Sequence, residues 1–505
     1  MSEIVVISGF FFLISLLLRS VIIYFYRDYF KAGKSGDASG HLIIIRQFKK
    51  NFFSKRIDQF ALTNRMHYAV GFHKYASFFS ESTLVKRGYL PSLLIFSIFS
   101  SLFFTATYIV SDQNIRLTAI TMLVFIASAS NVIFFGKQVT NINLSERLMA
   151  KMTAASSFFF MLLFLQTNNQ LFFIISVVCC ALNLLSSTFG RQVQLFVIPL
   201  FSIVTLSYFP ILIFVTAFVC ATILQPTYFL NSFSGTIKYW KITKAAKEST
   251  FQSWGLNYLN INIVIDNLKK LRLQNLINHL YQAEPTRVLF YFPTIIGSVI
   301  LLTISPNILY IQLYTAAIIV YSITTTYRFA HVGEGYRYIE YTLYMVSSYV
   351  FADLLLGMGD LIYPILIAYL IYNVFVVRTI IKHNNGKLKF VVQEDHLTRF
   401  LENISLNESD TLYTINSKVG LDIASRINVK VFWWQCGGFI DVKVFEEYWE
   451  RYPYWKKDWT ALFKKHSATH VIVDKTHLEK SEIDYDFSRL KLIYQDDYFI
   501  AYKIV

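Results

Sequence analysis

The chain has 505 residues, of which 54% are apolar and only 16% charged, and its formal net charge is +15. Soluble globular domains carry roughly 45–50% apolar and about 25% charged residues, so this composition disfavours an ordinary soluble protein and predicts an integral membrane protein. The basic residues border apolar stretches, so lipid phosphates or acidic glycans explain the charge more simply than nucleic acid, which we do not expect as a partner.

Stretches of about 20 apolar residues, the length that crosses a bilayer as a helix, recur along the chain. We expect spans at 4–26, 92–111, 117–136, 152–167, 170–188, 192–209, 211–230, 287–304, 308–326, 341–357 and 361–381. The run from 191 to 230 contains Pro199 and Pro210 and is compatible with one span or two. The sequence therefore predicts a polytopic α-helical membrane protein with about ten or eleven transmembrane helices.

The side of the membrane on which each loop lies depends on whether the run from 191 to 230 forms one span or two. With two spans between 191 and 230 and a cytoplasmic N-terminus, the long segments 27–91, 137–151, 231–286 and 327–340 all fall on the outer side, together with the C-terminal region. Segment 27–91 carries twelve Lys and Arg residues, which the positive-inside rule would place in the cytoplasm. Long loops translocate largely regardless of charge, and a basic amphipathic loop also suits membrane lipids on the outer face, so both orientations stay open.

After the last expected span, the long apolar stretches give way to a more polar sequence with short apolar runs. The polar tract 383–386 indicates a linker between a transmembrane domain at 1–383, which includes the long outer loop 27–91, and a soluble domain at 387–505. Short β-rich runs at 411–415, 430–434, 470–474, 490–494 and 498–504 alternate with helical patterns at 419–427 and 458–466. This alternation predicts a small C-terminal α/β domain, with a final hairpin that turns at 495–497.

A candidate acid/base pair follows the first span. Asp37 and His41 are four residues apart and share a face if the segment is helical, which suits an acid/base or metal-assisted step at the membrane surface. A capping Asp37 on an amphipathic helix through His41 and Phe48 fits the spacing equally well.

Several motifs resemble those of the GT-C superfamily of membrane glycosyltransferases. An acidic residue in the first loop precedes a Phe-His pair at 72–73, and residues 333–341 (GEGYRYIEY) are similar to the Gly-Glu-x-x-Arg-Tyr-x-Glu-Tyr signature of bacterial and archaeal members. Residues 144–147 stand where such proteins carry a second charged loop, and the strands at 468–474 and 498–503 look like their soluble tail. The family's Tyr-Pro-Pro element is absent at 66–70, and Gln435 follows Trp433-Trp434, so the Trp-Trp-Asp motif of oligosaccharyltransferases is missing and transfer to protein asparagine is disfavoured.

The resemblance implies transfer of one hexosyl or pentosyl unit from a polyprenyl-phosphate donor to a glycan, lipid or polysaccharide acceptor, in the biosynthesis of a cell-envelope polysaccharide. It places the active site and the C-terminal domain at the outer face of the plasma membrane. Asp37 is the expected catalytic base. The residues expected to bind the donor phosphate are Arg337, Arg328, His331, His41 and His73, and further candidates are Glu146, Arg147 and Glu334.

Other interpretations of these residues remain open. Arg337 could form an ordinary ion pair with Glu334 or Glu340, and each histidine could simply be hydrogen-bonded. Asp37 and Glu146 could hold a divalent cation, although no pair of carboxylates at metal spacing is visible, so the metal and any cofactor stay undetermined. A lipid-linked glycan transporter or flippase, or a polysaccharide polymerase, is the alternative function.

Overall fold

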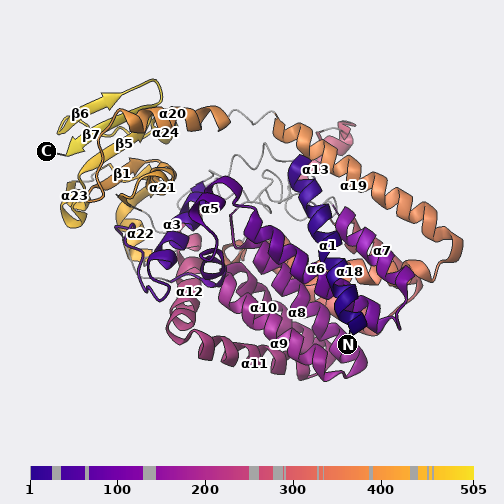
Figure 1. Cartoon of the computed structure of the whole chain (residues 1–505). Helices are drawn as coiled ribbons and strands as arrows, with labels where there is room; N and C mark the ends of the chain where they lie inside the picture. Colours follow the sequence, from indigo (N-terminus) through magenta and orange to yellow (C-terminus); the bar gives the residue numbers. More distant parts are fainter. Residues whose placement is uncertain are drawn as a thin grey trace. The chain divides into compact units, whose positions relative to one another are not determined.

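The protein is mostly helical, with a small sheet near its C-terminus (Figure 1). The structure, a computed structural model, describes residues 2–25, 36–62, 67–128, 144–248, 261–273, 275–276, 288, 292–326, 329–333, 335–385, 390–432, 442–451, 454–457 and 460–504. Two compact units form from separate parts of the chain. We call residues 1–27, 89–226 and 255–385 the helical unit, and residues 28–88, 227–254 and 386–505 the mixed unit.

Long apolar helices make up the helical unit. Its main helices are α1 (Ser2–Phe25), α6 (Leu90–Val110), α7 (Ile115–Ala127), α8 (Arg147–Thr167), α9 (Gln170–Ser186), α10 (Thr188–Thr205), α11 (Phe209–Leu224), α16 (Pro293–Ile304), α17 (Ile308–Thr324), α18 (Tyr336–Leu356) and α19 (Ile362–Asn385), with a short α13 (Ile261–Lys269). Among the described residues, five segments are long and apolar enough to cross a membrane: Glu3–Val21, Leu90–Val110, Arg147–Thr167, Thr188–Thr205 and Gly359–Arg378. This finding fits the expected membrane protein. Each predicted span overlaps a main helix of this unit, but α7, α9, α11, α16 and α17 are apolar helices of fewer than 18 residues. Helix α18, which overlaps the predicted span 341–357, is not among the apolar helices.

The run from 191 to 230 forms two helices rather than one. Pro199 lies inside α10 without ending it, whereas α10 ends at Thr205, before Leu206, whose φ of +52° is left-handed. Pro210 then occupies the first turn of α11, where its missing N–H removes no helical hydrogen bond. The break therefore comes from the left-handed residue and the second proline.

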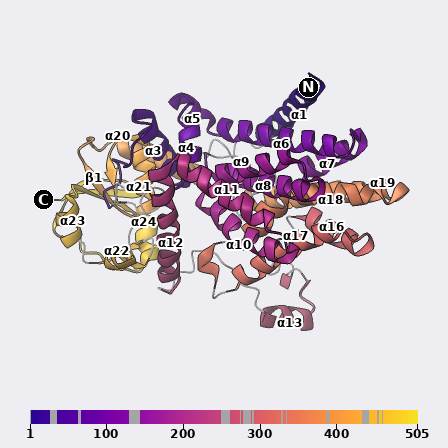
Figure 2. The same cartoon turned by 90° about the horizontal axis from the view of Figure 1, so that it is seen from below.

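Helix α18 forms the centre of the helical unit. All residues from Tyr336 to Ala352 are buried, and α18 packs against α7, α8, α10, α16 and α17 (Figure 2). A helix that is buried on every face can carry polar groups only where neighbouring helices supply partners for them. The polar side chains of α18 therefore depend on partners from the neighbouring helices.

The mixed unit is built on a five-stranded sheet in the order β2-β1-β5-β7-β6. The strands are β1 (Thr411–Ile415), β2 (Lys430–Val431), β5 (His470–Asp474), β6 (Leu490–Gln495) and β7 (Phe499–Ile504), and β3 (Trp449–Arg451) pairs separately with β4 (Tyr454–Trp455). The helices are α3 (Gly36–Lys50), α4 (Gly71–Ala76), α5 (Glu81–Arg87), α12 (Pro226–Glu248), α20 (Phe390–Glu402), α21 (Ser417–Arg426), α22 (Val442–Tyr448), α23 (Thr460–His466) and α24 (Lys475–Ser481).

The predicted strands and final hairpin are present. Strands β1, β2 and β5 run parallel, and β6 and β7 form the antiparallel hairpin. In its turn the Asp496 carboxylate accepts hydrogen bonds from the backbone N–H groups of Tyr498 at 2.8 Å and Phe499 at 2.7 Å. Two boundaries differ from expectation: β2 ends at Val431, with residues 433 and 434 outside the described part, and α19 continues to Asn385 instead of giving way to a linker at 383.

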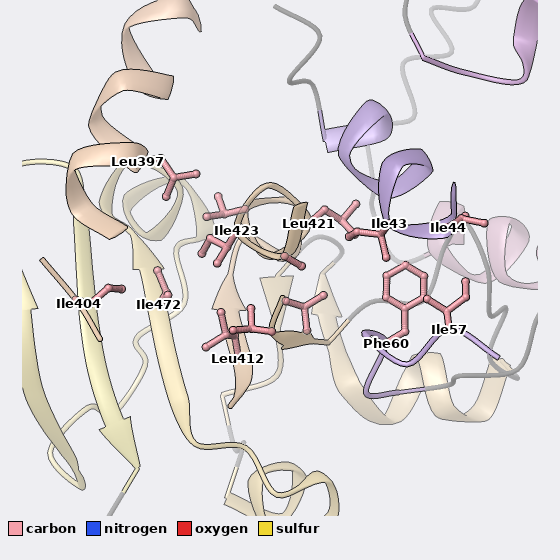
Figure 3. Packing of buried hydrophobic residues seen from close by; sticks show 14 of the residues in the cluster. Ile43, Ile44, Ile57, Phe60, Leu397, Ile404, Leu412, Leu421, Ile423 and Ile472 are labelled. Atoms are coloured by element: carbon pink, nitrogen blue, oxygen red, sulfur yellow. The ribbon is translucent and has the colours of Figure 1, made fainter. Parts of the chain in front are cut away.

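Residues 28–88 of the first loop form part of the same domain as the C-terminal sheet. The Gln59 carbonyl accepts a hydrogen bond from the N–H of Val431 at 2.8 Å, and the N–H of Ala61 donates to the carbonyl of Val431 at 2.9 Å, so residues 59–61 extend the edge of the sheet beyond β2. Ile43 and Ile44 of α3 pack towards Leu421 of α21 (Figure 3). Segments nearly 400 residues apart in sequence therefore share one hydrophobic core.

Replacing Ile43 by alanine tests that shared core. The side chain is fully buried, so Ile43→Ala should destabilise the mixed unit by about 2–5 kcal/mol. Val85→Ala, at an exposed position on α5, is the matched control and should change stability by less than about 0.5 kcal/mol. All seven tryptophans lie in the mixed unit, so thermal unfolding followed by tryptophan fluorescence reports on this unit. Equal unfolding midpoints for the two variants would show that α3 does not stabilise the sheet domain.

The mixed unit should lose stability in mild acid because of His470 on β5. Burial lowers the pKa of His470, and this effect outweighs the opposing effect of Asp410, whose carboxylate lies 3.5 Å from the ring. The unfolded chain therefore binds the proton more readily, and stability falls as the pH drops through about 6.5, the usual value for histidine. The tryptophan-monitored midpoint should decrease between neutral and mildly acidic pH, and His470→Gln should reduce that decrease. An unchanged pH dependence in the variant would assign it to other groups.

Candidate functional site

Arg337 lies in the first turn of α18, just after the point where the segment at Gly333 packs closely against α10. Gly333 has a φ of +144°, and a Cβ atom there would come within 2.7 Å of the Gln192 side-chain oxygen on α10. A side chain at position 333 is excluded both by this conformation and by the lack of space. The guanidinium of Arg337 is buried and lies 3.6 Å from the centre of the Phe189 ring, also on α10. The glycine thus lets the segment before α18 approach α10, whose Phe189 contacts Arg337.

A buried ion pair lies one turn further along α18. The Lys151 ammonium on α8 is 2.9 Å from the Glu340 carboxylate, and the two side chains are only 1% and 2% exposed. The ammonium also lies 3.7 Å from the centre of the Tyr344 ring. Both ions have lost their water, so each requires the other and removal of one leaves an uncompensated charge.

More charged groups surround this pair. Arg19 of α1 is buried with its guanidinium 4.8 Å from the centre of the Phe96 ring, and it interacts electrostatically with Lys151. Tyr341 interacts electrostatically with Arg337 and Glu340 of its own helix and with Glu146 and Arg147 at the start of α8. We call the buried Arg19, Lys151 and Arg337, the half-buried Arg147, and the buried carboxylates of Glu146 and Glu340 the buried charge cluster.

Within the described residues, the buried charge cluster contains four basic side chains and two carboxylates. Arg191 of α10, also buried, donates a hydrogen bond from Nε to the carbonyl oxygen of Leu184. Positive charge among apolar helices favours an anion, because the low local dielectric strengthens charge-assisted hydrogen bonds. The arrangement is therefore suited to a phosphate or carboxylate group that enters from an apolar environment.

A second group of polar residues lies in the mixed unit. Nδ1 of His41 on α3 is 2.8 Å from Nε2 of His73 on α4, and both rings are buried. Tyr68 lies beside both rings, with ring centres 6.4 Å and 5.6 Å away. One of the two bonded nitrogens must donate and the other accept, so the bond fixes complementary tautomers and is lost if both rings are protonated. Such a pair can hold or pass one proton.

The structure locates most of the predicted site residues. Asp37 is in the first turn of α3, four residues before His41, but its side chain lies outside the described part, as do Arg328 and Glu334. His331 is half-buried in the short 3-10 helix at Ala330–Val332. The structure brings His41 together with His73. Arg337, Glu146 and Arg147 each interact electrostatically with Tyr341. Within the described residues, no group of three or more His, Cys, Asp or Glu side chains could hold a metal ion.

Lys151 was not among the predicted site residues. It directly precedes the apolar run 152–167 and therefore resembled an ordinary flanking lysine. The signal that could have found it is helical spacing: Arg147 and Lys151 are four residues apart on α8, and Arg337 and Glu340 are three apart on α18. Each pair projects from one side of its helix.

Breaking and then deleting the ion pair tests its role. Lys151→Met should destabilise the helical unit by about 3–5 kcal/mol, because Glu340 is left buried without its cation. The double variant Lys151→Met with Glu340→Met should recover most of that loss, since both charges are gone. The measurement is the temperature at which purified protein loses its monodisperse size-exclusion peak. A double variant no more stable than Lys151→Met would show that the two side chains are not coupled.

Comparison of the sequence with protein-family models gives no match, and comparison with curated proteins gives none. The chemistry of the site is therefore argued from its own residues. Two separate groups of residues carry that chemistry: the buried charge cluster of α1, α8 and α18 in the helical unit, and the histidine pair of α3 and α4 in the mixed unit.

Proposed function

We propose that this protein is a membrane glycosyltransferase of the GT-C type, which transfers one sugar from a polyprenyl-phosphate donor to a glycan, lipid or polysaccharide acceptor at the outer face of the plasma membrane. The observation that supports the proposal is the gathering of basic side chains, Lys151 and Arg337 buried and Arg147 half-buried, near the start of α8 and α18, where α8 is apolar enough to cross a membrane. A lipid-linked phosphate is an anion that reaches such a position from the bilayer itself.

On the donor side, the proposal assigns the phosphate to Arg337. A guanidinium can donate two parallel hydrogen bonds to phosphate oxygens, and its charge stabilises the negative charge that develops on the leaving group. The ring of Phe189 supports the guanidinium from one side. Arg147 supplies further positive charge, while the Lys151 and Glu340 pair holds α8 against α18 and keeps the cluster in place.

On the acceptor side, the proposal assigns the base to Asp37. The carboxylate takes the proton of the acceptor hydroxyl as its oxygen attacks the anomeric carbon of the sugar. A carbon–oxygen bond to the acceptor forms, the bond from that carbon to the phosphate oxygen breaks, and polyprenyl phosphate leaves with the electron pair. The resemblance favours inversion of configuration in this single displacement. His41 follows Asp37 by one helical turn on α3, and the proposal assigns it with its partner His73 to the same step.

The experiment measures sugar transfer by the purified full-length protein, supplied with synthetic radiolabelled polyprenyl-phosphate sugars and a cell-envelope extract as the acceptor source. Arg337→Gln should lower the rate about 10²- to 10³-fold, as expected when one stabilising donor is removed. Asp37→Asn should lower it about 10²- to 10⁴-fold, as expected for loss of a general base. Arg116→Gln, an exposed arginine at the start of α7, should leave transfer unchanged.

The outcomes separate the alternatives. Transfer that survives Asp37→Asn but not Arg337→Gln would remove the base assignment and keep the phosphate site. Equal transfer by all three variants would exclude both assignments. A wild-type protein that moves labelled lipid-linked sugar across vesicles without consuming it would instead favour the transporter or flippase function, which the same buried positive charge could serve.

A further inference from the structure

An exposed aromatic cluster lies on the first loop. Phe53 and Phe78 are 75% and 78% exposed, and Phe52, between them, is 37% exposed. The ring centre of Phe52 is 5.5 Å from that of Phe53 and 5.8 Å from that of Phe78, so the three side chains form one continuous apolar surface, which we call the aromatic tip. Large apolar side chains grouped in this way on an exposed surface indicate a contact site.

Lys74 lies beneath this cluster and keeps it together. Its ammonium is 4.8 Å from the ring centre of Phe52, 5.7 Å from that of Phe53 and 4.1 Å from that of Tyr228 on α12. Within the described residues no carboxylate pairs with Lys74, so cation–π contacts are its main interactions. The aromatic rings are the interaction partners of the Lys74 ammonium, so the tip is ordered without a paired carboxylate. A carboxylate at this position would repel an anionic surface.

Chain continuity ties the tip to two membrane helices. Phe78 precedes Leu90, the first residue of the candidate span Leu90–Val110, by twelve residues, seven of which form α5. Tyr228, whose hydroxyl donates a hydrogen bond to the carbonyl of Ser54 at 2.7 Å, follows the end of apolar helix α11 at Leu224 by four residues. Four extended residues cover at most about 14 Å, so only a short connection separates Tyr228 from the end of α11.

The charged residues that flank the tip indicate what kind of surface it would bind. Exposed basic side chains lie on both sides of it in sequence, and these are Lys49, Lys50, Lys55, Arg56, Lys86 and Arg87. Of the acidic side chains near them, Glu81 forms an ion pair with Arg46 at 2.7 Å. Aromatic rings at headgroup depth and surrounding lysines and arginines are the two elements with which peripheral segments bind anionic bilayers.

From these observations we propose that the aromatic tip inserts into the headgroup region of an anionic lipid bilayer, with Lys55, Arg56, Lys86 and Arg87 on the lipid phosphates. This anchoring would hold the mixed unit at a membrane surface. It does not depend on the proposed glycosyltransferase activity, since it concerns lipid contact alone.

The test uses full-length protein in lipid nanodiscs, with the four native cysteines replaced by alanine and an environment-sensitive fluorophore attached at Phe78→Cys. Nitroxide-labelled lipids should quench this fluorophore strongly in discs that contain phosphatidylglycerol and weakly in discs of phosphatidylcholine alone. The same label at Asp484→Cys, a position with a 98% exposed side chain in the mixed unit, is the control and should not be quenched.

Two further variants separate the apolar and the charged contributions. Phe52→Ser with Phe53→Ser should reduce quenching at position 78 towards the control value, and unchanged tryptophan-monitored unfolding would show that the unit is still folded. Lys55→Gln with Arg56→Gln, both exposed, should weaken the preference for phosphatidylglycerol. Quenching at position 78 no greater than at position 484 would overturn the proposal, and equal quenching in the two lipids would remove its anionic specificity.

Discussion

The helical unit depends on the compensation of charge in a region without water. An ammonium or carboxylate that loses its hydration is strongly disfavoured unless an opposite charge replaces the water, and Lys151 and Glu340 supply that replacement across the contact of α8 with α18. Hydrophobic residues of similar volume would stabilise this contact as well or better. A buried ion pair at the central helix therefore suggests a role beyond stability.

The mixed unit follows a different principle, because its parts are far apart in sequence and no part has a complete core. Helix α3 alone presents Ile43, Ile44 and Phe48 on one face, and an isolated amphipathic helix of 15 residues is marginal in water. The sheet likewise has an open edge at β2, which residues 59–61 cover by backbone pairing. The sheet domain covers the apolar face of α3, and residues 59–61 cover the strand edge of the sheet. These contacts fix the segment that carries His41 and His73.

Sequence patterns predicted the local elements well and the long-range associations poorly. Apolar runs and proline positions located the helices, and β-rich runs located β1 and β5 at their observed bounds, because periodicity and turn residues are local signals. The pairing of Val431 with the first loop could not be predicted, since backbone hydrogen bonds at a sheet edge require no particular side chains. Arg337 and His73 were found through motif resemblance, whereas Lys151 required knowledge of which helix faces α18. Contacts between distant segments leave no trace in the sequence of either segment alone.

The composition of the mixed unit also constrains how the chain crosses the membrane. Its three segments share hydrophobic clusters and the Tyr228 to Ser54 hydrogen bond, so in a membrane they would have to lie on one side of the bilayer. Between the segments at 28–88 and 227–254, the described residues form the helices α6 to α11, and crossing by all six would return the chain to the side from which it left. A single crossing between 191 and 230 would make that number odd and would separate segments that share a core. Crossing by α16, α17, α18 and α19 would likewise bring the C-terminal sheet back to the side of the segment at 28–88.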